Sequence, residues 1–542
     1  MSFICSIFSV LLHYVVLPFV ALYILLIIYH EYLSSQRDIQ DLALLNQSNI
    51  AATRKSNETA IYRNNQTPHG LPLVTGLAVR DGFKLRDGNL RDWWSVLIAQ
   101  EKKKESPESD RVIVEDSKTG TMLLSMSQIQ TLSSQLSSYF KGKEYTVIGS
   151  VLPLFSYHSL LLSLACFSTN GLTYHHFIDF PRTQPEEVDV MVCYKSQLTF
   201  VQRLKYKLII VIDSESTSSG IVSWDQIISE PTPTAFEHTH DPKETLSYPF
   251  RQTTSLNATH SYTHQNFVSS CASMVKSLPM AHELTSNDTI MITQGNDLTQ
   301  WGKFMAALIV GGKVILGDSD DKEVIDSWIE KYQPSIISVN EKYVTNTVNS
   351  YDQEESKKSG VAASFNSLIL SRAIHMFSEG IFTSSAQQSS LFNSLRLTYI
   401  THHIATNDPA SNLTSSDLTK YRAITSSRAI QTTSLPPSTG GLLSHIFQTN
   451  YYDYRILSTD KLRNLGTVTL TLELKLRAVP GLDIEQDKAG EVCIRGFVVG
   501  TPYGEKALGV ARKDGEEVGG EGWCPLRGVR GRFGIDGCFY EG

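Results

Sequence analysis

The stretch GKVILGDSDDKEVIDSWIEKYQPSIISV, residues 312–339, decides the fold. Its segment KVILGD predicts a strand, and the segment SIISV at its far end predicts a second strand. Between them, apolar residues recur at the spacing of a helix face, at Val324, Ile325, Trp328 and Ile329. Asp318 or Asp320 can cap this helix, and Pro334 stops it. A strand, a helix and a strand in this order predict one βαβ crossover of a parallel sheet.

The same alternation occurs on the amino-terminal side of this unit. Strand-like runs lie at residues 145–153, 191–194 and 207–213, and an apolar helical run lies at residues 157–168. This order predicts an α/β fold in which helices cover parallel sheets. From about residue 450 the segments TVTLTLELKLRAV and AGEVCIRGFVVG are rich in strand formers. We therefore expect an α/β region over residues 61–448 and a β-rich subdomain over residues 449–542.

Length and charge limit the classes of function. The chain has 542 residues, 41% of them hydrophobic, which is enough for two or three folded domains. Its formal net charge of −7 gives no broad basic field, so we expect no nucleic-acid partner. The seven cysteines are scattered without a C-x-x-C pair, so the sequence predicts no metal site and reduced, mostly buried thiols.

The amino terminus predicts a membrane anchor over residues 1–30. Ser2 to Tyr29 contains no charged residue, and as a helix it would cover roughly 40 Å, more than the roughly 30 Å hydrocarbon core of a bilayer. The run is too long, and its start too bare of charge, for a cleavable signal peptide. Pro18 leaves open whether the segment spans the membrane or forms a shallow hairpin.

Polar segments predict a tether and surface loops. Residues 31–60 are rich in Gln, Asn and Ser, which indicates a linker between the membrane and the globular part. The charged patches at residues 101–110 and 352–360 are typical of solvated loops. The adjacent pairs His175-His176 and His402-His403 point to different sides of any strand or helix, so we expect ordinary structural histidines.

A second stretch, TTSLNATHSYTHQNF at residues 253–267, bears on function. A phosphate-binding loop uses glycines to bring backbone N–H groups close to a polyphosphate and a lysine to neutralise its charge. This stretch has the threonines and the length of such a loop, but it contains neither glycine nor lysine.

The stretch resembles the corresponding loop of the adenylate-forming superfamily, the acyl-CoA synthetases and their relatives, which reads roughly T-T-G-x-P-K-G and ends in H-x-N. Thr253, Thr254, His264 and Asn266 match this pattern, whereas Ser255, Asn257, Ala258 and Thr259 replace its glycine, proline, lysine and last glycine. The segments at residues 306–318, 489–496 and 521–540 resemble three further motifs of the superfamily in the same order. The resemblance runs from about residue 120 to the end.

The resemblance implies the large amino-terminal α/β part of an acyl-CoA synthetase, here with a β-rich subdomain and a preceding membrane helix. That superfamily joins a carboxylic acid to AMP and passes the acyl group to a thiol, so it implies ATP, magnesium and coenzyme A as cofactors. The aspartate that holds the ribose corresponds to Val529, and the glutamate that helps to hold magnesium corresponds to Pro436. The superfamily continues past the position of Gly542 into a lid that carries a catalytic lysine, so we expect that lysine to be missing.

We therefore expect a membrane-anchored, catalytically degenerate acyl-CoA synthetase-like protein that binds a lipid, a nucleotide or a protein partner, with membrane lipid and a fatty acid or acyl-CoA as candidate lipid partners. One alternative is an active fatty-acid–CoA ligase with a divergent ATP site, and another is a non-catalytic subunit of an active synthetase. The candidate cofactor-binding residues are Thr253, Thr254, His264, Asn266 and Val529; the first four can instead support the helix that starts near His264. No catalytic residue is assigned. By the habit of the superfamily, we expect the endoplasmic reticulum or a lipid droplet, with the globular part in the cytosol.

Overall fold

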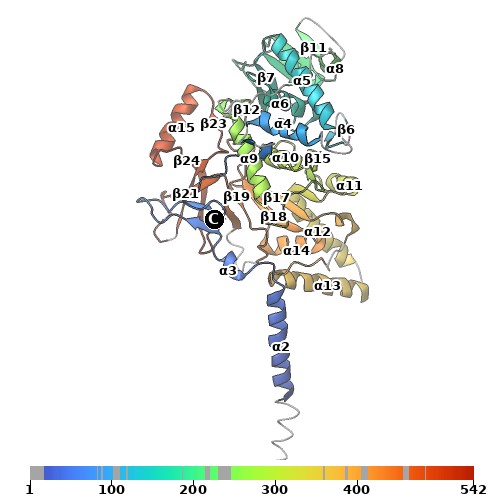
Figure 1. Ribbon diagram of the computed structural model, residues 1–542, viewed down its shortest axis with the longest axis vertical. Coiled ribbons are helices and arrows are strands. Elements are labelled where there is room, and N and C mark those ends of the chain that lie inside the picture. The colour runs from blue at the N-terminus through green and yellow to red at the C-terminus, as the bar shows by residue number, and fades with distance from the viewer. Residues whose placement is uncertain are drawn as a thin grey trace, which may run out of the picture.

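The computed structural model describes residues 17–77, 79–81, 84–86, 89–101, 110–116, 120–185, 187–213, 220–229, 246–357, 361–384, 389–404, 413–455, 463–482, 484–486 and 488–541. These residues form an elongated body, and helix α2 (Leu17–Ser35) projects from one end of it (Figure 1). The strands belong to a fifteen-stranded sheet, an eight-stranded sheet and a hairpin, β3 (Val79–Asp81) with β4 (Lys84–Arg86).

The predicted βαβ unit is confirmed. It consists of β15 (Lys313–Leu316), α11 (Lys322–Tyr332) and β16 (Ile336–Asn340). Both strands pair in parallel with β14 (Thr289–Ile292), which lies between them. The sequence therefore specifies a parallel sheet through local features alone: two apolar strands and one amphipathic helix whose buried residues are Ile325 and Ile329.

The predicted cap of α11 is wrong by one to three residues. Asp321 is the N-cap residue, and its carboxylate accepts a hydrogen bond of 3.0 Å from the backbone N–H of Glu323. Asp318 instead accepts from the backbone N–H of Gly295 at 3.0 Å, and Asp320 accepts from the side chain of Asn340. Both carboxylates thus stabilise the loops at the carboxyl ends of the strands, where polar groups outside the sheet need hydrogen-bond partners.

The fifteen-stranded sheet joins the α/β region to the β-rich region. Its six central strands, from β18 to β5, run in parallel, and antiparallel strands continue it on both sides. Besides β14, β15 and β16, its strands are β1 (Ser48–Ile50), β2 (Tyr62–Asn64), β5 (Val112–Asp116), β6 (Gly120–Leu124), β17 (Leu397–His403), β18 (Arg428–Ser434), β19 (Phe447–Gln448), β20 (Arg463–Val468), β21 (Leu472–Arg477), β22 (Ala489–Gly496), β24 (Cys524–Phe533) and β25 (Phe539–Glu541).

The eight-stranded sheet carries the predicted phosphate loop near one edge. Its strands, in spatial order, are β11 (Ile221–Ser223), β10 (Leu208–Val211), β9 (Val190–Cys193), β7 (Val147–Ser150), β8 (Thr173–Phe177), β12 (Phe250–Thr253), β13 (Thr259–Tyr262) and β23 (Thr501–Pro502). The runs predicted at residues 145–153, 191–194 and 207–213 are β7, β9 and β10. The pairing of β13 with β23 links this sheet to the β-rich region.

Helices cover both sheets. Those that share the largest core are α4 (Leu90–Glu101), α5 (Met126–Gly142), α6 (Tyr157–Ser168), α8 (Trp224–Ser229), α9 (His264–Lys276) and α10 (Gln300–Ile309), and every residue of α10 is buried. A second core lies under α11, α12 (Glu341–Lys357), α13 (Val361–Ser378) and α14 (Ser415–Thr425). The remaining α-helices are α2, α3 (Asp41–Leu44), α7 (Leu198–Val201) and α15 (Glu505–Glu517). The α/β fold is confirmed.

The amino-terminal segment differs from the predicted tether. Residues 41–50 form α3 and β1, and β1 pairs with β2 and so joins the large sheet. Leu44, Gln47 and Ser48 are buried, and the Ser48 hydroxyl donates to the carbonyl oxygen of Gly537 at 2.6 Å. Local composition missed this strand because β1 has only three residues and joins the sheet through β2, which pairs with β21 far along the chain.

The predicted anchor is described only in part, because residues 1–16 lie outside the described residues. From Leu17 onward the segment is helical as α2. Among the described residues, no helix combines the length and the apolar character needed to cross a membrane.

The structure gives different results for the two charged segments that were predicted as surface loops. Most of the patch at residues 101–110 lies outside the described residues. The patch at residues 352–360 was predicted as a loop, but its described part, residues 352–357, is the last turn and a half of α12. Charged residues with good helix propensity continue that helix into solvent.

Asp288 provides a test of the fold, because it lies where the parallel strands β14, β16 and β17 begin. Its carboxylate accepts two hydrogen bonds of 2.8 Å from Arg396 and one of 2.8 Å from the hydroxyl of Ser335. We expect Asp288→Asn to lower the free energy of unfolding by about 2 kcal/mol, because a largely buried ion pair loses one partner. Urea unfolding followed by circular dichroism measures the change.

The matched control is Asp352→Asn, which removes an exposed ion pair with Lys420. Because solvent screens exposed pairs, its cost should stay below about 1 kcal/mol. Equal costs in the two variants would contradict the structural role given to Asp288.

Candidate functional site

The predicted phosphate loop is a tight hairpin turn that uses its own backbone groups. Strands β12 and β13 pair in antiparallel fashion up to Thr253 and Thr259. Between them, the N–H of Thr254 donates to the carbonyl oxygen of Ala258, and the N–H of Asn257 donates to the carbonyl oxygen of Thr254, both at 2.9 Å. Asn257 adopts the left-handed conformation, with φ of 59°. Three N–H groups of the turn, those of Thr254, Asn257 and Ala258, are therefore bonded within it and not directed at a ligand.

The two threonine side chains of this turn also have partners in the protein. The Thr253 hydroxyl contacts His175 Nε2 at 2.7 Å and the hydroxyl of Thr259 at 2.8 Å. Thr254 is buried, and its hydroxyl accepts from the N–H of Ala258 at 3.3 Å. Both hydroxyls stabilise the hairpin.

Asn266 caps a helix, as the alternative interpretation predicted. Helix α9 begins after Thr263, whose hydroxyl accepts from the N–H of Asn266 at 3.2 Å. In return, Asn266 Oδ1 accepts from the N–H of Thr263 at 2.7 Å, which completes a capping box. Asn266 Nδ2 donates to the carbonyl oxygen of Phe497 at 2.7 Å and so ties the helix start to the β-rich region.

His264 is buried beside the start of α4. Its Nδ1 accepts a hydrogen bond of 3.3 Å from the backbone N–H of Leu90. Burial, together with the nearby Arg91, lowers the pKa of His264 to about 3, so the ring is neutral at physiological pH. The prediction that Thr253, Thr254, His264 and Asn266 bind a cofactor remains a prediction, and all four have structural contacts.

The loop that follows β18, residues 435–442, packs directly on the hairpin turn. Gly440 has φ of 62°, and a Cβ added there would lie 2.6 Å from the methyl carbon of Thr254. The N–H of Gly441 donates to the Tyr262 hydroxyl at 3.0 Å. Pro436, at the position of the expected glutamate, accepts from the N–H of Thr439 at 3.0 Å through its carbonyl oxygen. The loop and the turn are thus in direct contact at Gly440 and Thr254.

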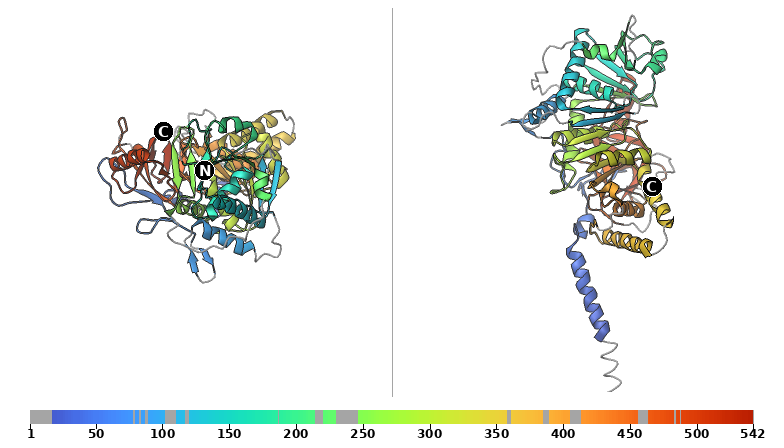
Figure 2. Two further views of the ribbon diagram at one scale, coloured as in Figure 1. Left: turned by 90° about the horizontal axis from the view of Figure 1, so that it is seen from above. Right: turned by 90° about the vertical axis from the view of Figure 1, so that its right-hand side faces the viewer.

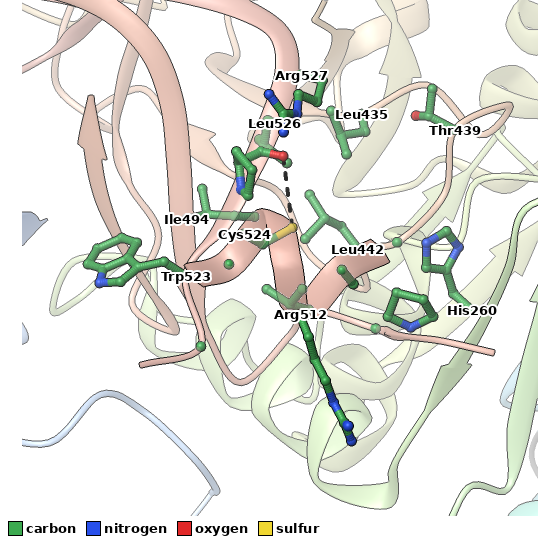
Figure 3. Close-up of a pocket in the computed structure, with 18 of the residues that line it drawn as sticks. His260, Leu435, Thr439, Leu442, Ile494, Arg512, Trp523, Cys524, Leu526 and Arg527 are labelled. Atoms are coloured by element: carbon green, nitrogen blue, oxygen red, sulfur yellow. Dashed lines mark hydrogen bonds between the residues drawn. The ribbon is translucent and has the colours of Figure 1, made fainter. Parts of the chain in front are cut away.

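Val529 lies in β24 and lines a cavity of about 560 Å³. The cavity lies between the loop at residues 435–442, the strands β22 and β24, and helix α15 (Figure 3). Its lining is mainly apolar and includes Leu435, Leu442, Ile494, Leu508, Trp523, Leu526 and Val529. A valine side chain accepts no hydrogen bond, so this position cannot hold a ribose as an aspartate would.

The polar side chains that line this cavity are His260, Thr439, Arg512, Glu516, Glu521 and Arg527. Arg527 is exposed and pairs with Asp514 at 2.7 Å and Glu517 at 3.2 Å. Arg512 extends away from Leu442 and Cys524 in Figure 3. His260 lines the cavity from β13, and its buried Nδ1 has no hydrogen-bond partner among the described residues. Burial lowers the pKa of His260, which favours a neutral imidazole.

These residues do not fit a nucleoside triphosphate and its magnesium ion. The turn at residues 254–258 offers no lysine, its N–H groups at Thr254, Asn257 and Ala258 are bonded, and Val529 replaces the carboxylate. Among the described residues, no group of three or more His, Cys, Asp and Glu side chains is arranged to hold a metal ion. What the arrangement offers is a cavity with mainly apolar walls, one neutral imidazole, and charged side chains from α15 and from the segment around β24.

Sequence reasoning missed a buried polar cluster at the carboxyl edge of the large sheet. Lys303 of α10 is fully buried, and its Nζ donates to Gln300 at 3.0 Å and to Ser338 of β16 at 2.8 Å. Burial lowers the pKa of Lys303 to about 7. A lone lysine within the apolar helix QWGKFMAALI was the available signal, because a helix that is apolar all round is buried.

The same cluster contains Asp297, His403 and His445. Burial alone would raise the pKa of Asp297. Two neighbours instead hold this pKa below its ordinary value: His403, whose Nε2 lies 3.6 Å from the carboxylate, and the N–H of Thr299. Both ring nitrogens of buried His445 have no hydrogen-bond partner among the described residues, and burial lowers its pKa. The hydrogen bonds of the cluster join α10 to β16, to β17 and to Gln294 in the loop after β14, so it stabilises this edge of the sheet.

A test of the site concerns the pH dependence of stability. Because the pKa of His264 is about 3 in the folded chain and about 6.5 when unfolded, its contribution to stability is lost as pH falls below 6.5. The loss reaches about 2 kcal/mol at pH 5. In the variant His264→Gln, the side-chain oxygen can still accept the hydrogen bond from the N–H of Leu90, but the side chain does not titrate. Between pH 7 and pH 5, the free energy of unfolding of this variant should therefore fall by about 2 kcal/mol less than that of the native chain.

Urea unfolding at the two pH values measures this difference. His375→Gln, which changes an exposed histidine of α13, is the control and should keep the native pH dependence. An unchanged pH dependence in His264→Gln would show that His264 is not held neutral in the fold.

Comparisons with known proteins agree with this architecture. No family model matches the chain. A Saccharomyces cerevisiae protein described as uncharacterized protein YHR045W is 30% identical over 560 residues, which cover 94% of each chain. A luciferase-like enzyme from the mealworm Zophobas morio has a TM-score of 0.57 at 13% identity, over 87% of this chain and 99% of that one.

Two CoA ligases have the same fold. A long-chain-fatty-acid–CoA ligase from Archaeoglobus fulgidus has a TM-score of 0.57 at 14% identity over 84% of each chain. An anthranilate CoA ligase, solved with anthranoyl-AMP, has a TM-score of 0.56 at 14% identity over 84% of this chain and 76% of that one. The chain belongs to one family with the yeast protein, and its fold is that of the adenylate-forming superfamily, as the sequence motifs predicted.

Proposed function

We propose that the protein is a membrane-attached, acyl-CoA synthetase-like protein that holds an uncharged acyl chain and does not run the adenylation reaction at an ordinary rate. The observation that carries this proposal is the apolar cavity beside Val529. It lies where the superfamily pattern places the ribose carboxylate, next to a turn that has closed on itself.

The size and lining of the cavity favour an apolar ligand. Ligand sites in proteins commonly have volumes of about 300–1,000 Å³, and the 560 Å³ cavity falls within this range. Each buried methylene gains about 0.8 kcal/mol, so a chain segment of about eight methylenes would gain roughly 6 kcal/mol before the cost of ordering it. An acyl chain uses this lining fully, whereas a nucleotide would leave its charged groups without partners.

His260 indicates the chemistry of the ligand's polar end. A neutral imidazole with an unpaired buried nitrogen can exchange one hydrogen bond with a carbonyl or hydroxyl group. Arg527 is already paired with two carboxylates at the surface. We therefore propose an ester or another uncharged acyl compound rather than a free carboxylate.

Exposed apolar side chains support attachment to a membrane. Along α2, large side chains such as Phe19, Tyr23, Leu25 and Ile28 are each at least 58% exposed. Soluble surfaces rarely present such a continuous apolar face. Tyr29 and Tyr32, which follow this run, are residue types enriched at membrane interfaces. The endoplasmic reticulum or a lipid droplet, with the body in the cytosol, remains our proposal for the location.

The departures in the nucleotide region argue against a working ligase. Loss of one preorganised electrostatic group typically costs about 10²–10³ in rate, and here the turn, Val529 and Pro436 all depart from the superfamily pattern. A ligase with a divergent ATP site, or a subunit that needs a partner, would have to supply these charges from elsewhere.

The proposal is tested by photocrosslinking. The full chain, reconstituted in phosphatidylcholine vesicles, is irradiated with a diazirine-bearing palmitate methyl ester, and mass spectrometry locates the adducts. We expect adducts in the peptides that contain Leu442 and Leu526, because both side chains line the cavity.

Matched variants on α15 make this test specific. Ala511→Trp should fill the cavity and reduce these adducts at least about fivefold, which corresponds to about 1 kcal/mol. Lys513→Trp changes an exposed residue of the same helix that lines neither this cavity nor the adjoining pocket at Val510, and should leave the adducts unchanged. Adducts on α2 serve as the internal standard, and equal cavity labelling in both variants would contradict the proposal.

A further inference from the structure

Helix α13 lies at the end of the body from which α2 projects. It runs crosswise to α2, near the level at which α2 meets the body, in both side views (Figures 1 and 2). The lobe formed by the eight-stranded sheet lies at the opposite end, as the labels of β7 and β11 show in Figure 1. If α2 enters a membrane, α13 therefore lies at the end of the body that is next to that membrane.

The described part of α13 has two unlike faces. Leu370, Ala373 and Phe377 recur at helical spacing and are buried in the second core. On the opposite face, Phe365 is 60% exposed and Leu368 is 67% exposed. Arg372 and His375 are exposed along the same stripe. We call Phe365, Leu368, Arg372 and His375 the foot surface.

Contacts that follow α2 fix it beside the carboxyl end of α13. The backbone N–H of Asp38 donates to the carbonyl oxygen of Gly380 at 3.1 Å, and Arg37 pairs with Glu379 at 3.3 Å. The Asp38 carboxylate accepts from Arg428 at 2.9 Å and from the Tyr454 hydroxyl at 3.1 Å. Because Arg428 and Tyr454 are buried in the body, Arg37 and Asp38, which follow α2 directly, are held beside the carboxyl end of α13.

The foot surface has the chemistry of a membrane interface. Two exposed apolar side chains can enter the boundary between headgroups and acyl chains, and Arg372 can extend to lipid phosphates. Tyr32 of α2 lies three residues before the end of that helix, roughly 5 Å along its axis. An interfacial helix is buried by roughly 5–10 Å, so one bilayer can receive α2 and touch the foot surface together.

We propose that the foot surface lies on the same membrane that α2 enters, so that the body is held by two contacts in one orientation. This inference rests on the proposed membrane attachment. The occupant is the lipid bilayer, because the foot surface lies at the end of the body from which α2 projects, exposes Phe365 and Leu368, and carries Arg372, which complements the negative charge of lipid phosphates. If a second copy or another protein covered the foot surface instead, the test below would show no quenching by lipid at that surface.

The test is quenching of tryptophan fluorescence by brominated lipid. Phe365→Trp in the full chain is reconstituted in vesicles of phosphatidylcholine and phosphatidylserine, with or without bromine on the acyl chains of the phosphatidylcholine. We expect bromine to reduce the emission of the added tryptophan at least about twofold, because interfacial residues reach the upper acyl chains. Leu368→Trp provides an independent second position with the same expectation.

Two control variants separate the possible failures. Phe200→Trp alters an exposed phenylalanine of α7 in the opposite lobe and should show no quenching. Phe19→Trp, on α2, reports membrane insertion itself. Quenching at Phe19→Trp without quenching at Phe365→Trp and Leu368→Trp would overturn the foot surface and leave the anchor intact. Absence of quenching at all three positions would overturn the membrane attachment as well.

Discussion

The hydrogen bond from the N–H of Thr254 to the carbonyl oxygen of Ala258 closes the turn on which the rest of the site depends. A phosphate-binding loop keeps such N–H groups free for its ligand, whereas this turn bonds them internally. The loop after β18 can then pack against the turn at Gly440, and the cavity beyond it is left with an apolar lining that includes Val529. Closure of the turn thus accounts for the packing and for the chemistry of the cavity.

Two rigid connections relate this site to the remainder of the chain. Asn266 ties the start of α9 to Phe497 in the β-rich region, so the hairpin, the helix and the cavity wall keep one arrangement. On the far side of the large sheet, Asp38 ties the end of α2 to Arg428, at the start of β18. The strand β18 therefore begins beside the proposed anchor and leads into the loop that covers the turn, which places the cavity at a fixed position relative to the membrane that we propose.

Local sequence patterns predicted the βαβ unit, the α/β fold and the superfamily, because each depends on residues close together in the chain. They failed where distant partners decide the outcome. The sequence predicted Asp318 or Asp320 as the cap, but these carboxylates bind Gly295 and Asn340, and Asp321 caps the helix. Strand β1 joins the sheet through β2, which pairs with the distant strand β21, and the Lys303 cluster is assembled from α10, β16 and β17, so composition alone predicts neither. Thr253 and Thr254 were aligned from their motif, but their contacts depend on His175 and Ala258.

The most direct measurement of the central claim is calorimetric titration of magnesium-ATP into the purified full chain, with a Val529→Asp variant beside it. If the turn is closed and the cavity is apolar, the native chain should show no saturable heat, which corresponds to a dissociation constant weaker than about 1 mM. Saturable binding by the native chain with a dissociation constant of about 1 μM would contradict the account, because the turn would then have to open and expose its N–H groups to phosphate.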